Sequence, residues 1–536
     1  MTLNRFLPAA ITKKVLLDMG INLVDVAGKL ANLNAQEIGR DSDRIKQWKK
    51  MNVPPVFDEK ELNNIIQDSL TRLGAMQLSD GGWGWFSGYG EWSSPHTTAL
   101  VVHGLLICRK NDVKFDENML NRGIQWLKNY QAQELAKNKN APSKTEPYKG
   151  HADNLDALVY MVLSENKFFE KEMKAFLIRD KKDLSVYGLS LIGLAFHEEG
   201  DQENRDKIVT NMKQYLVEDN ENQTAYLRLP QDYFWWFWYG SETETQAFFL
   251  KLIVVAEPKG DLAPKLVKYL LNNRKHSTYW DSTRDTAYCI EAFADFLRGS
   301  GEDAPDMTVE VKYDGKTVKT AKIDKSNLFT FDDKVVMKGS EVATGNHNVE
   351  IVKKGKGPLY FNSYLSYFTL EDFITKAGLE IKVERKYYRL KETTKKVQVQ
   401  GKIGNALLQN QEKYEREEIS DKTVLKSGDM VEVELIIESK NDYEYIIFED
   451  MKPAGFEASE VRSGYNGNAL NAYVEFHTEK VCFFVRTLAR GKHSVAYRVR
   501  AEIPGSFSAL PTKASAMYAP ELRGNSDEFK TTIKDK

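Results

Sequence analysis

The sequence has few cysteines and no excess of either charge. Its 536 residues include only Cys108, Cys289 and Cys482, an odd number set far apart in the chain. This spacing excludes a disulfide scaffold and a zinc site built from cysteines. Lys and Arg number 75 against 77 Asp and Glu, so the formal net charge is −2. Because phosphate contacts need a surplus of basic residues, this balance argues against a nucleic-acid-binding protein.

Long apolar runs are also absent from the sequence. No stretch of about 18 apolar residues occurs, so we expect no membrane-spanning segment in this chain. The first residues, Met1 to Pro8, lack the layout of a signal peptide and pass directly into a helical pattern. At about 150 residues per domain, the length predicts three or four domains.

A repeated pattern organises the first 300 residues. Five times, a short polar cluster precedes a nearly all-apolar helix, starting at Ser94, Gly150, Asp183, Glu242 and Asp281. The Ser, Thr and Asp side chains of these clusters can cap the free N–H groups of the first turn. A helix that is apolar on all sides has to be buried.

Charge-rich amphipathic helices are predicted between the copies, at 60–77, 117–133, 168–180 and 263–274. An alternation of buried and half-exposed helices is typical of an inner ring of helices enclosed by an outer ring. We therefore predict an α/α toroid over residues 1–300, with a linear helical solenoid as the alternative.

Beyond residue 300 the apolar residues alternate, as in β-strands. Residues 304–370 contain four such segments, with Asp-Gly and Gly-Asn turns between them, at 307–315, 316–324, 347–355 and 359–368. A second set runs from 380 to 536. Short strands with regular turns over this length predict an antiparallel β-sandwich. The expected fold is therefore multidomain, with an all-α toroid followed by two all-β domains.

Several strings resemble the bacterial alpha-2-macroglobulin family. Two of them, Thr2 to Pro8 and Asp80 to Trp85, lie early in the predicted toroid, and Trp280 to Ala287 opens its last inner helix. The others lie in the predicted sandwich, at Phe448 to Phe456, Arg500 to Gly505 and Ala516 to Glu521. Each string is modest by itself, but together they span nearly the whole chain in the order that the family has.

The resemblance implies a domain assignment. Residues 1–300 would be the thioester domain, 304–370 a portion of the CUB-like β-domain, and 380–536 the C-terminal macroglobulin-like β-sandwich. In the family a Cys-x-Glu-Gln thioester motif directly precedes a segment like Thr2 to Pro8. That motif is absent here, and Met1 stands where its Gln would be. We therefore expect a C-terminal fragment without the thioester chemistry.

The resemblance also implies a function. Members of the family are broad-spectrum protease inhibitors that trap a protease after it cleaves a bait segment, so we expect no enzyme, cofactor or metal. The expected partners are target proteases and the upstream macroglobulin domains of the same chain. The expected location is the bacterial periplasm or cell envelope, with a lipid anchor at the missing N-terminus.

Few residues are candidates for the site. No catalytic residue is assigned, but His151 with Asp153 matches the position of an acyl-transfer histidine in complement-type relatives; the alternative is that His151 only helps to cap its helix. Trp83 and Trp85 are expected either to wall a thioester pocket or to pack as plugs behind a glycine turn. Tyr518 is a candidate for an aromatic residue that covers the thioester, or else an ordinary strand tyrosine.

Other histidines, aromatics and functions remain as alternatives. We expect His103, inside an apolar helix, to be a satisfied core histidine, and the aromatic run 234–239 to be a packed connection. A terpene cyclase would need an Asp-x-Asp-Asp acid, which the sequence lacks. A polysaccharide lyase could use Tyr148, His151 and Arg284, and a structural adhesion module is a third alternative.

Overall fold

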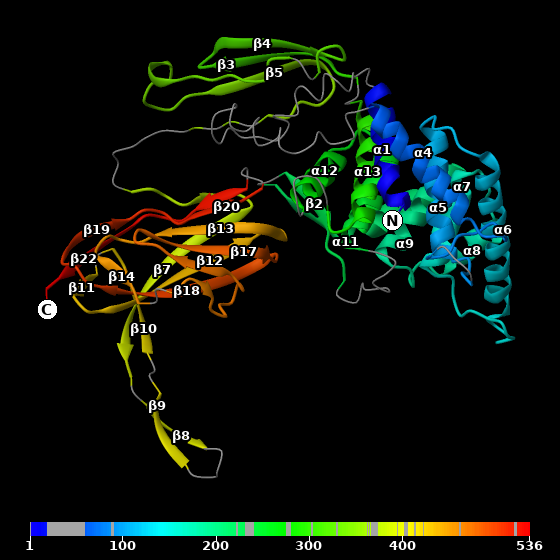
Figure 1. The fold of residues 1–536 in the computed structure, drawn as a ribbon. Coiled ribbons are helices and arrows are strands. Elements are labelled where there is room, and N and C mark those ends of the chain that lie inside the picture. Colours follow the sequence, from blue (N-terminus) through cyan, green and yellow to red (C-terminus); the bar gives the residue numbers. More distant parts are fainter. Residues whose placement is uncertain are drawn as a thin grey trace. The chain divides into compact units, whose positions relative to one another are not determined.

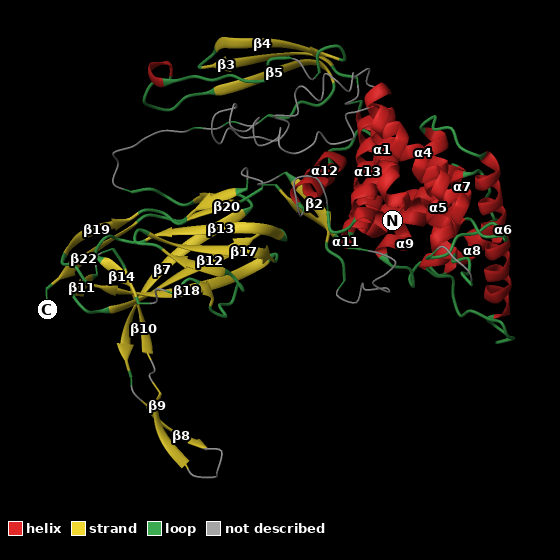
Figure 2. Cartoon of the chain, viewed as in Figure 1, coloured by secondary structure: helices red, strands yellow, loops and turns green. Residues whose placement is uncertain are grey.

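The computed structural model separates helices from strands along the chain (Figures 1 and 2). It describes residues 2–18, 59–86, 90–220, 223–230, 241–274, 280–301, 304–328, 331–361, 363, 365, 373–393, 395–400, 406–411, 414–421, 423–459, 462–518 and 522–535. The chain divides into two compact units, one made mainly of residues up to 363 and the other mainly of residues from 364 onward.

The described helices of the first 300 residues form two layers. The helices with the more buried surfaces are α1 (Thr2–Asp18), α5 (Pro95–Lys110), α7 (Asn154–Glu165), α9 (Val186–Glu199), α11 (Glu242–Ala256) and α13 (Thr283–Ser300). The helices between them are α4 (Glu59–Met76), α6 (Glu117–Asn140), α8 (Lys171–Arg179), α10 (Gln202–Lys213) and α12 (Leu262–Asn272).

The inner helices form a closed ring. Each packs against the next in the order α1, α5, α7, α9, α11 and α13, and α13 packs against α1. Figure 1 shows α1 (blue) beside α13 (green), although almost the whole helical region separates them in the sequence. A linear solenoid has no contact between its first and last helices. The predicted α/α toroid is therefore confirmed.

Polar caps fix the start of the inner helices. Ser94, Asp153, Ser185, Ser241 and Ser282 are the N-cap residues of α5, α7, α9, α11 and α13, and each accepts a hydrogen bond from a backbone N–H of the first turn. Such a cap contributes about 1 kcal/mol to helix stability. Four of these five caps come from the polar clusters of the sequence repeat, as predicted, whereas Ser241 directly precedes the cluster that starts at Glu242.

One part of the helical region differs from the all-α prediction. A hairpin of β1 (Leu216–Asp219) and β2 (Thr224–Leu227) joins α10 to α11. The amide of Gln246 on α11, buried in the core, accepts a hydrogen bond from the Leu227 N–H at 2.9 Å and donates one to the Leu227 carbonyl at 2.8 Å. This tertiary contact stabilises strands that are too short to show a clear alternation in the sequence.

A three-stranded antiparallel sheet follows the helices. It consists of β3 (Asp306–Tyr313), β4 (Lys316–Asp324) and β5 (Val349–Lys356) in the order β4-β3-β5, with the short helix η3 (Gly339–Glu341) between β4 and β5. Three of the four predicted segments are therefore strands. The described residues of the fourth, 359–368, do not form one.

The second unit is a two-layer β-sandwich. One sheet has the order β10-β7-β12-β18-β14, and the other has the order β15-β16-β17-β13-β20-β21-β6. Residues on β12 alternate between buried and partly exposed, and they enclose a core with residues such as Phe448 and Phe483. The two-sheet core agrees with the predicted sandwich.

The strands of the sandwich have these bounds: β6 (Ala377–Gly378), β7 (Ile381–Glu392), β10 (Tyr414–Ile419), β12 (Met430–Ser439), β13 (Tyr443–Met451), β14 (Phe456–Ala458), β15 (Gly464–Tyr465), β16 (Tyr473–Phe476), β17 (Lys480–Leu488), β18 (Gly491–Ala501), β20 (Lys513–Ala516) and β21 (Arg523–Asn525). Two smaller sheets add β11 (Val424–Lys426), β22 (Phe529–Lys534) and β19 (Gly505–Ala509), and the hairpin of β8 (Lys395–Gln400) and β9 (Ala406–Gln411). The pair β11 and β22 is parallel, which departs from the purely antiparallel prediction.

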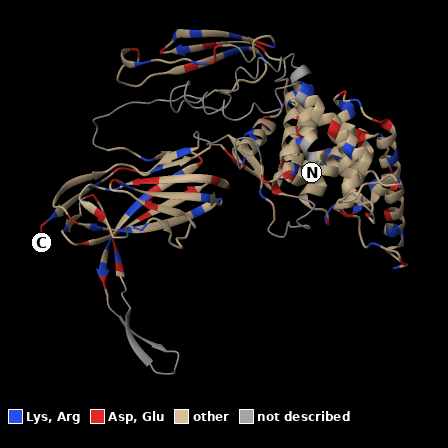
Figure 3. Ribbon diagram, in the orientation of Figure 1, with Lys and Arg blue, Asp and Glu red and all other residues tan. Residues whose placement is uncertain are grey.

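Basic and acidic residues are interspersed along the helices and strands of both units (Figure 3). This mixing agrees with the near-neutral composition. Among the helices that the structure describes, none has the length and apolar character needed to cross a bilayer.

Buried charges connect the inner helices across the ring. The ring of His103 on α5 lies between two carboxylates, with Nδ1 2.7 Å from Glu165 Oε2 and Nε2 3.2 Å from Glu291 Oε1. On α11, the Lys251 ammonium contacts Glu291 and lies 2.8 Å from Asp295 Oδ2. The network therefore joins α5, α7, α11 and α13, and His103 is the satisfied core histidine that the sequence predicts.

The network keeps its members charged. Burial alone would lower the pKa of His103, but Glu165 and Glu291 outweigh it and raise that pKa to about 10. Burial alone would raise the pKa of Glu291, but Lys251 and His103 outweigh it and hold that pKa well below its usual range. Each buried charge thus depends on its partners for stability.

We expect Glu291→Gln to destabilise the helical unit, because it leaves Lys251 and His103 each with one carboxylate fewer. The expected loss is about 3 kcal/mol in the free energy of unfolding. Urea unfolding followed by helical circular dichroism measures it. The control is Glu203→Gln, which breaks an exposed pair with Lys207 on α10 and should cost below about 0.5 kcal/mol. Equal unfolding midpoints for the two variants would contradict a structural role for the network.

Candidate functional site

Five inner helices, α5 to α13, begin at one end of the ring. Each pair of neighbours among them is joined through one outer helix that runs back, so these helices share a direction. Helix α1 is parallel to α5 but starts beside its middle, because Leu3 packs against Gly104, whereas Lys14 reaches Asp112 beyond the end of α5 at 2.8 Å. Partial positive charges of the helix dipoles therefore meet at this end, which favours anionic groups there.

A glycine turn leads into this end of the ring. Gly81 has a φ of +96°, which an L-residue rarely adopts. The Asp80 carboxylate holds the turn, because it accepts hydrogen bonds from the Gly82 N–H at 3.1 Å, the Ser93 hydroxyl at 2.7 Å and the Trp126 indole at 2.9 Å. Burial alone would raise the pKa of Asp80, but these donors outweigh it and lower that pKa.

The two tryptophans of the turn differ in environment. Trp83 is 2% exposed, donates from its indole to the Leu73 carbonyl at 2.9 Å and packs in the helical core, as a structural plug would. Trp85 is 50% exposed and stacks on the His96 ring with centroids 6.4 Å apart. The packed role expected for Trp85 is therefore not what the structure has. The backbone N–H of Trp85 donates a hydrogen bond to Glu91 Oε1 at 2.7 Å. This contact holds Trp85 in a surface loop.

Trp85 belongs to an exposed aromatic loop. Among the described residues of this loop, Phe86 and Trp92 are also large and apolar, and they are 75% and 84% exposed. We call Trp85, Phe86 and Trp92 the aromatic loop. A loop that presents large apolar side chains at the N-terminal end of the ring can cover a group bound there.

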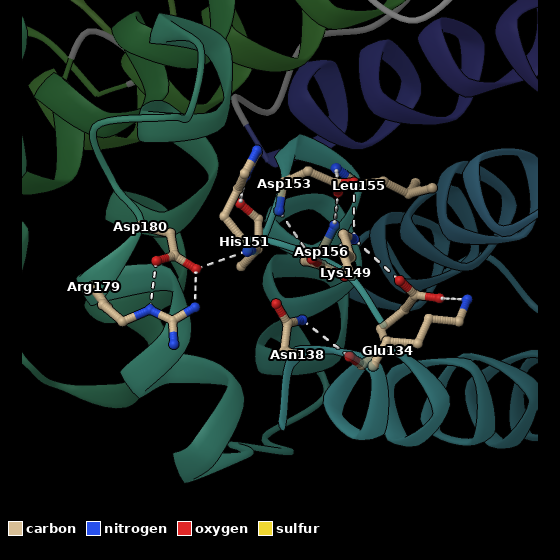
Figure 4. A network of polar contacts seen from close by, with 11 residues as sticks. Glu134, Asn138, Lys149, His151, Asp153, Leu155, Asp156, Arg179 and Asp180 are labelled. Carbon is tan, nitrogen blue, oxygen red and sulfur yellow. Dashed lines mark hydrogen bonds and ion pairs between the residues drawn. The ribbon is translucent and has the colours of Figure 1, made fainter. Parts of the chain in front are cut away.

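His151 and Asp153 lie directly before α7 (Figure 4). His151 is exposed, and its Nδ1 lies 3.0 Å from the Ala152 carbonyl. The Asp153 carboxylate accepts hydrogen bonds from the N–H groups of Leu155 and Asp156 at 2.9 and 3.1 Å, and its second oxygen lies 2.8 Å from Lys149 Nζ. Asp153 thus caps the helix instead of orienting His151.

The cap of α7 belongs to a larger polar network (Figure 4). Lys149 Nζ also lies 2.7 Å from Asp156 Oδ2 and 3.1 Å from Glu134 Oε2. Burial raises the pKa of Asp156 to about 6, with a further contribution from the Asp153 charge and opposition from Lys149. On the other side, Asp180 Oδ2 accepts from the Ala152 N–H at 2.7 Å. These contacts fix the backbone on both sides of His151.

A buried acid at the same end was not identified from the sequence. Glu244 in the first turn of α11 is fully buried, and its carboxylate lies 3.1 Å from the guanidinium of Arg284 at the start of α13. Burial raises the pKa of Glu244 to about 7, although Arg284 opposes the shift. Burial together with the Arg284 charge lowers the pKa of His96 to about 3. The sequence signal that could have identified Glu244 is an acidic residue inside a predicted inner helix that is otherwise mostly apolar.

In the second unit, Tyr518 follows β20 and is 54% exposed. Its ring meets the Tyr445 ring edge to face at 5.2 Å. Tyr445 has a φ of +56° inside β13, which is a strained backbone conformation. Its carbonyl accepts a hydrogen bond from the Met517 N–H at 2.8 Å. Tyr518 is therefore an exposed aromatic side chain whose ring packs against Tyr445.

The three cysteines cannot supply a reactive thiolate in this fold. All three are free thiols and buried. Burial raises the pKa of Cys108 to about 12, of Cys482 to about 11, and of Cys289 well above its usual value. Within the part of the chain that the structure describes, no group of three or more His, Cys, Asp or Glu residues is placed to hold a metal ion. The aromatic run 234–239 lies outside the described residues.

Two family models match the chain. The A-macroglobulin TED domain matches residues 43–296, and the bacterial alpha-2-macroglobulin MG10 domain matches residues 381–521. An alpha-2-macroglobulin homolog of Nostoc sp. is 23% identical over 489 residues, which is 90% of this chain and 24% of the relative. The alpha-2-macroglobulin of Thermotoga maritima is 26% identical over 341 residues, 62% of this chain and 17% of the relative. The chain thus spans a quarter or less of these relatives.

Solved structures of Escherichia coli alpha-2-macroglobulin are also similar. The form activated by porcine elastase is 16% identical, with a TM-score of 0.40 over 89% of this chain and 39% of that chain. The trypsin-activated form is 16% identical, with a TM-score of 0.44 over 89% of this chain and 30% of that chain.

We expect the stability of the chain to depend on pH through Glu244. Its pKa is about 7 in the fold against 4.5 when unfolded, so the folded state binds the proton more tightly and loses stability as the pH rises from about 4.5 to 7. The Glu244→Gln variant has no carboxyl at this position to titrate. Between pH 5 and pH 8, the unfolding free energy of the variant minus that of the wild type should therefore increase by on the order of 2 kcal/mol. Urea unfolding at several pH values measures this gain.

The control is Glu242→Gln, which changes an exposed glutamate in the same helical turn. The difference in unfolding free energy between Glu242→Gln and the wild type should stay constant from pH 5 to 8. If the difference for Glu244→Gln were also constant, the buried carboxyl would not titrate in this pH range.

Proposed function

Because this chain belongs to the bacterial alpha-2-macroglobulin family, with a TED domain followed by an MG10 domain, we propose that it is the C-terminal part of a broad-spectrum protease inhibitor. In such a protein, cleavage of a bait segment triggers a conformational change that traps the protease. A trap of this kind is consumed by the reaction, so we propose no turnover activity for this chain.

The observation that carries the proposal is the common direction of the inner helices. In the family, the thioester motif directly precedes a segment like Thr2 to Pro8. A thioester joined there would lie at the N-terminus of α1, beside the middle of α5. The partial positive charge at the start of α1 would stabilise the oxyanion formed by nucleophilic attack and the thiolate that leaves. The helical ring therefore supplies a suitable electrostatic environment for acyl transfer.

A thioester persists in water only when it is shielded. We propose that the aromatic loop, through Trp85, supplies part of this shield, and that Trp83 holds the loop from the core. Tyr518 of the macroglobulin-like domain is our candidate for a further shielding residue. Its exposure and its support by Tyr445 favour this role over that of an ordinary strand tyrosine.

We propose that His151 assists acyl transfer from its exposed position before α7. The imidazole lies at the N-terminal end of an inner helix, on the end of the ring where α5 to α13 begin. Asp153 then has a positioning role, because it caps α7 and contacts Lys149 Nζ. The arrangement favours His151 acting without a carboxylate partner.

The remaining assignments follow from the family. We propose that target proteases and upstream macroglobulin domains are the partners, that the protein works in the bacterial periplasm or envelope with a lipid anchor, and that it needs no cofactor. We also propose residues 1–300, 304–370 and 380–536 as thioester-type, CUB-like and macroglobulin-like domains.

Protease trapping can be tested on the gene product that contains this chain. After incubation with trypsin, a trap leaves the protease active on a small chromogenic peptide but inactive on a large protein substrate. We expect Tyr518→Ala to lose trapping during storage, because an unshielded thioester hydrolyses. Tyr465→Ala, which changes another exposed tyrosine of the same domain, is the matched control. Equal hydrolysis of both substrates by the treated wild type would refute the trap.

The 536-residue chain should incorporate no labelled methylamine. Its sequence contains no Cys-x-Glu-Gln string, and its three thiols are buried in the protonated form. A thioester needs both the activated acyl group and a thiol as its leaving group. Mass spectrometry after incubation measures the adduct. Stoichiometric labelling of the native chain would overturn this expectation.

A further inference from the structure

The peptide group between Ala152 and Asp153 has a hydrogen bond on each of its polar atoms (Figure 4). Its carbonyl oxygen lies 3.0 Å from His151 Nδ1, and its N–H donates to Asp156 Oδ2 at 2.9 Å. A carboxylate, a peptide and an imidazole therefore form one chain of hydrogen bonds. Because each bond in such a chain polarises the next, the Asp156 charge strengthens the carbonyl as an acceptor.

The Ala152 carbonyl determines which nitrogen of His151 carries the hydrogen. A carbonyl oxygen can only accept a hydrogen bond, so the neutral ring donates from Nδ1. The second ring nitrogen, Nε2, then keeps its lone pair. Because His151 is exposed, the ring can present this lone pair to a reacting group.

Asp156 is anchored in the orientation that this chain of hydrogen bonds needs. Its side chain is buried, and Oδ2 also lies 2.7 Å from Lys149 Nζ. Lys149 Nζ in turn lies 3.1 Å from Glu134 Oε2 on α6. The Asp156 carboxylate is therefore tied to an outer helix, which keeps Oδ2 on the Asp153 N–H.

The peptide group before Ala152 is fixed from the other side. The Ala152 N–H donates to Asp180 Oδ2 at 2.7 Å. Arg179 holds the Asp180 carboxylate through two hydrogen bonds of 2.6 and 2.7 Å. Ala152 itself is fully buried. Both peptide groups that flank Ala152 are thus held, so its carbonyl stays directed at the His151 ring.

We propose that Asp156 is a positioning residue for His151, which acts through the Ala152–Asp153 peptide and keeps Nε2 as the nitrogen with the free lone pair. Asp156 acts across one peptide group, so no carboxylate needs to contact the ring. Asp153, the nearer carboxylate in the sequence, caps α7 instead.

This inference rests on the proposed role of His151 in acyl transfer. In that role Nε2 accepts the proton of an attacking amine, whose nitrogen bonds to the acyl carbon of the thioester. The carbon–sulfur bond breaks, and the imidazolium returns the proton to the thiolate that leaves. The imidazolium donates from Nδ1 more strongly than the neutral ring does. Asp156 therefore stabilises it through the polarised peptide.

Nitrogen-15 NMR of the 536-residue chain with labelled histidine rings tests the inference without any thioester. The spectra are recorded at pH 8, above the ordinary histidine pKa of about 6.5 and above the pKa of Asp156, which burial raises to about 6. We expect His151, assigned by the signals lost in His151→Gln, to carry its hydrogen on Nδ1. Asp156→Ala should lower the ratio of this tautomer to the other about fivefold, because the hydrogen bond that selects it weakens.

Two further variants complete the NMR test. Asp156→Asn keeps an oxygen that can accept the Asp153 N–H but has no charge, so it should lower the ratio about twofold. It decides the test if circular dichroism shows that Asp156→Ala does not fold. Asp153→Ser is the matched control, because it removes the nearer carboxylate and serine still caps a helix. An unchanged ratio in the Asp156 variants, or an equal fall in Asp153→Ser, would overturn the proposal.

The gene product that contains this chain tests the link to acyl transfer, with labelled methylamine as the probe. His151→Gln and Asp156→Ala should both slow its incorporation, whereas Asp153→Ser should react as the wild type does. A slower His151→Gln with an unchanged Asp156→Ala would overturn the proposal for Asp156 alone. If the wild type incorporates no methylamine, the proposed thioester chemistry fails, and the tautomer ratio still decides whether Asp156 positions His151.

Discussion

The burial of charge inside the helical ring is the constraint on which the rest of this structure depends. His103, Lys251 and Glu291 come from α5, α11 and α13, and each is buried with a partner of opposite charge. Opening the ring would separate these partners and leave charges unpaired in an apolar core, which costs several kcal/mol. The network therefore stabilises the closed arrangement more than any open one. The outer helices that run back between α5, α7, α9, α11 and α13 give these inner helices a common direction, so the closed ring has two chemically different ends.

The two ends of the ring differ in chemistry. At the N-terminal end of α5 to α13, backbone N–H groups and helix dipoles favour anionic groups, and the exposed aromatic loop with Trp85 lies beside it. At the C-terminal end, a cavity is lined by charged side chains that are paired with partners, such as Glu165 with His103 and Lys110 with Asp295.

The sequence predicted helix starts correctly where one residue, the N-cap, determines the local structure. A Ser or Asp before an apolar run caps a helix because its oxygen reaches an N–H within the same turn, and Ser185 and Asp153 do so. The environment of Trp85 could not be predicted, because Trp83 and Trp85 share one glycine turn and only the folded loop decides which of them enters the core. Glu244 was missed for a similar reason. Its partner Arg284 is 40 residues away, and only the packing of α11 against α13 brings the two together.

The sequence by itself determined the alternation of buried and exposed helices, the change to strands near residue 300 and the family strings, because these depend on period and on local residue type. The tertiary structure decided that the helices close into a ring, that Asp153 caps α7 instead of pairing with His151, and that a charged cavity forms at the C-terminal end. Each of these depends on contacts between residues far apart in the chain. No local pattern records such contacts, since their free energy arises only when the helices pack together.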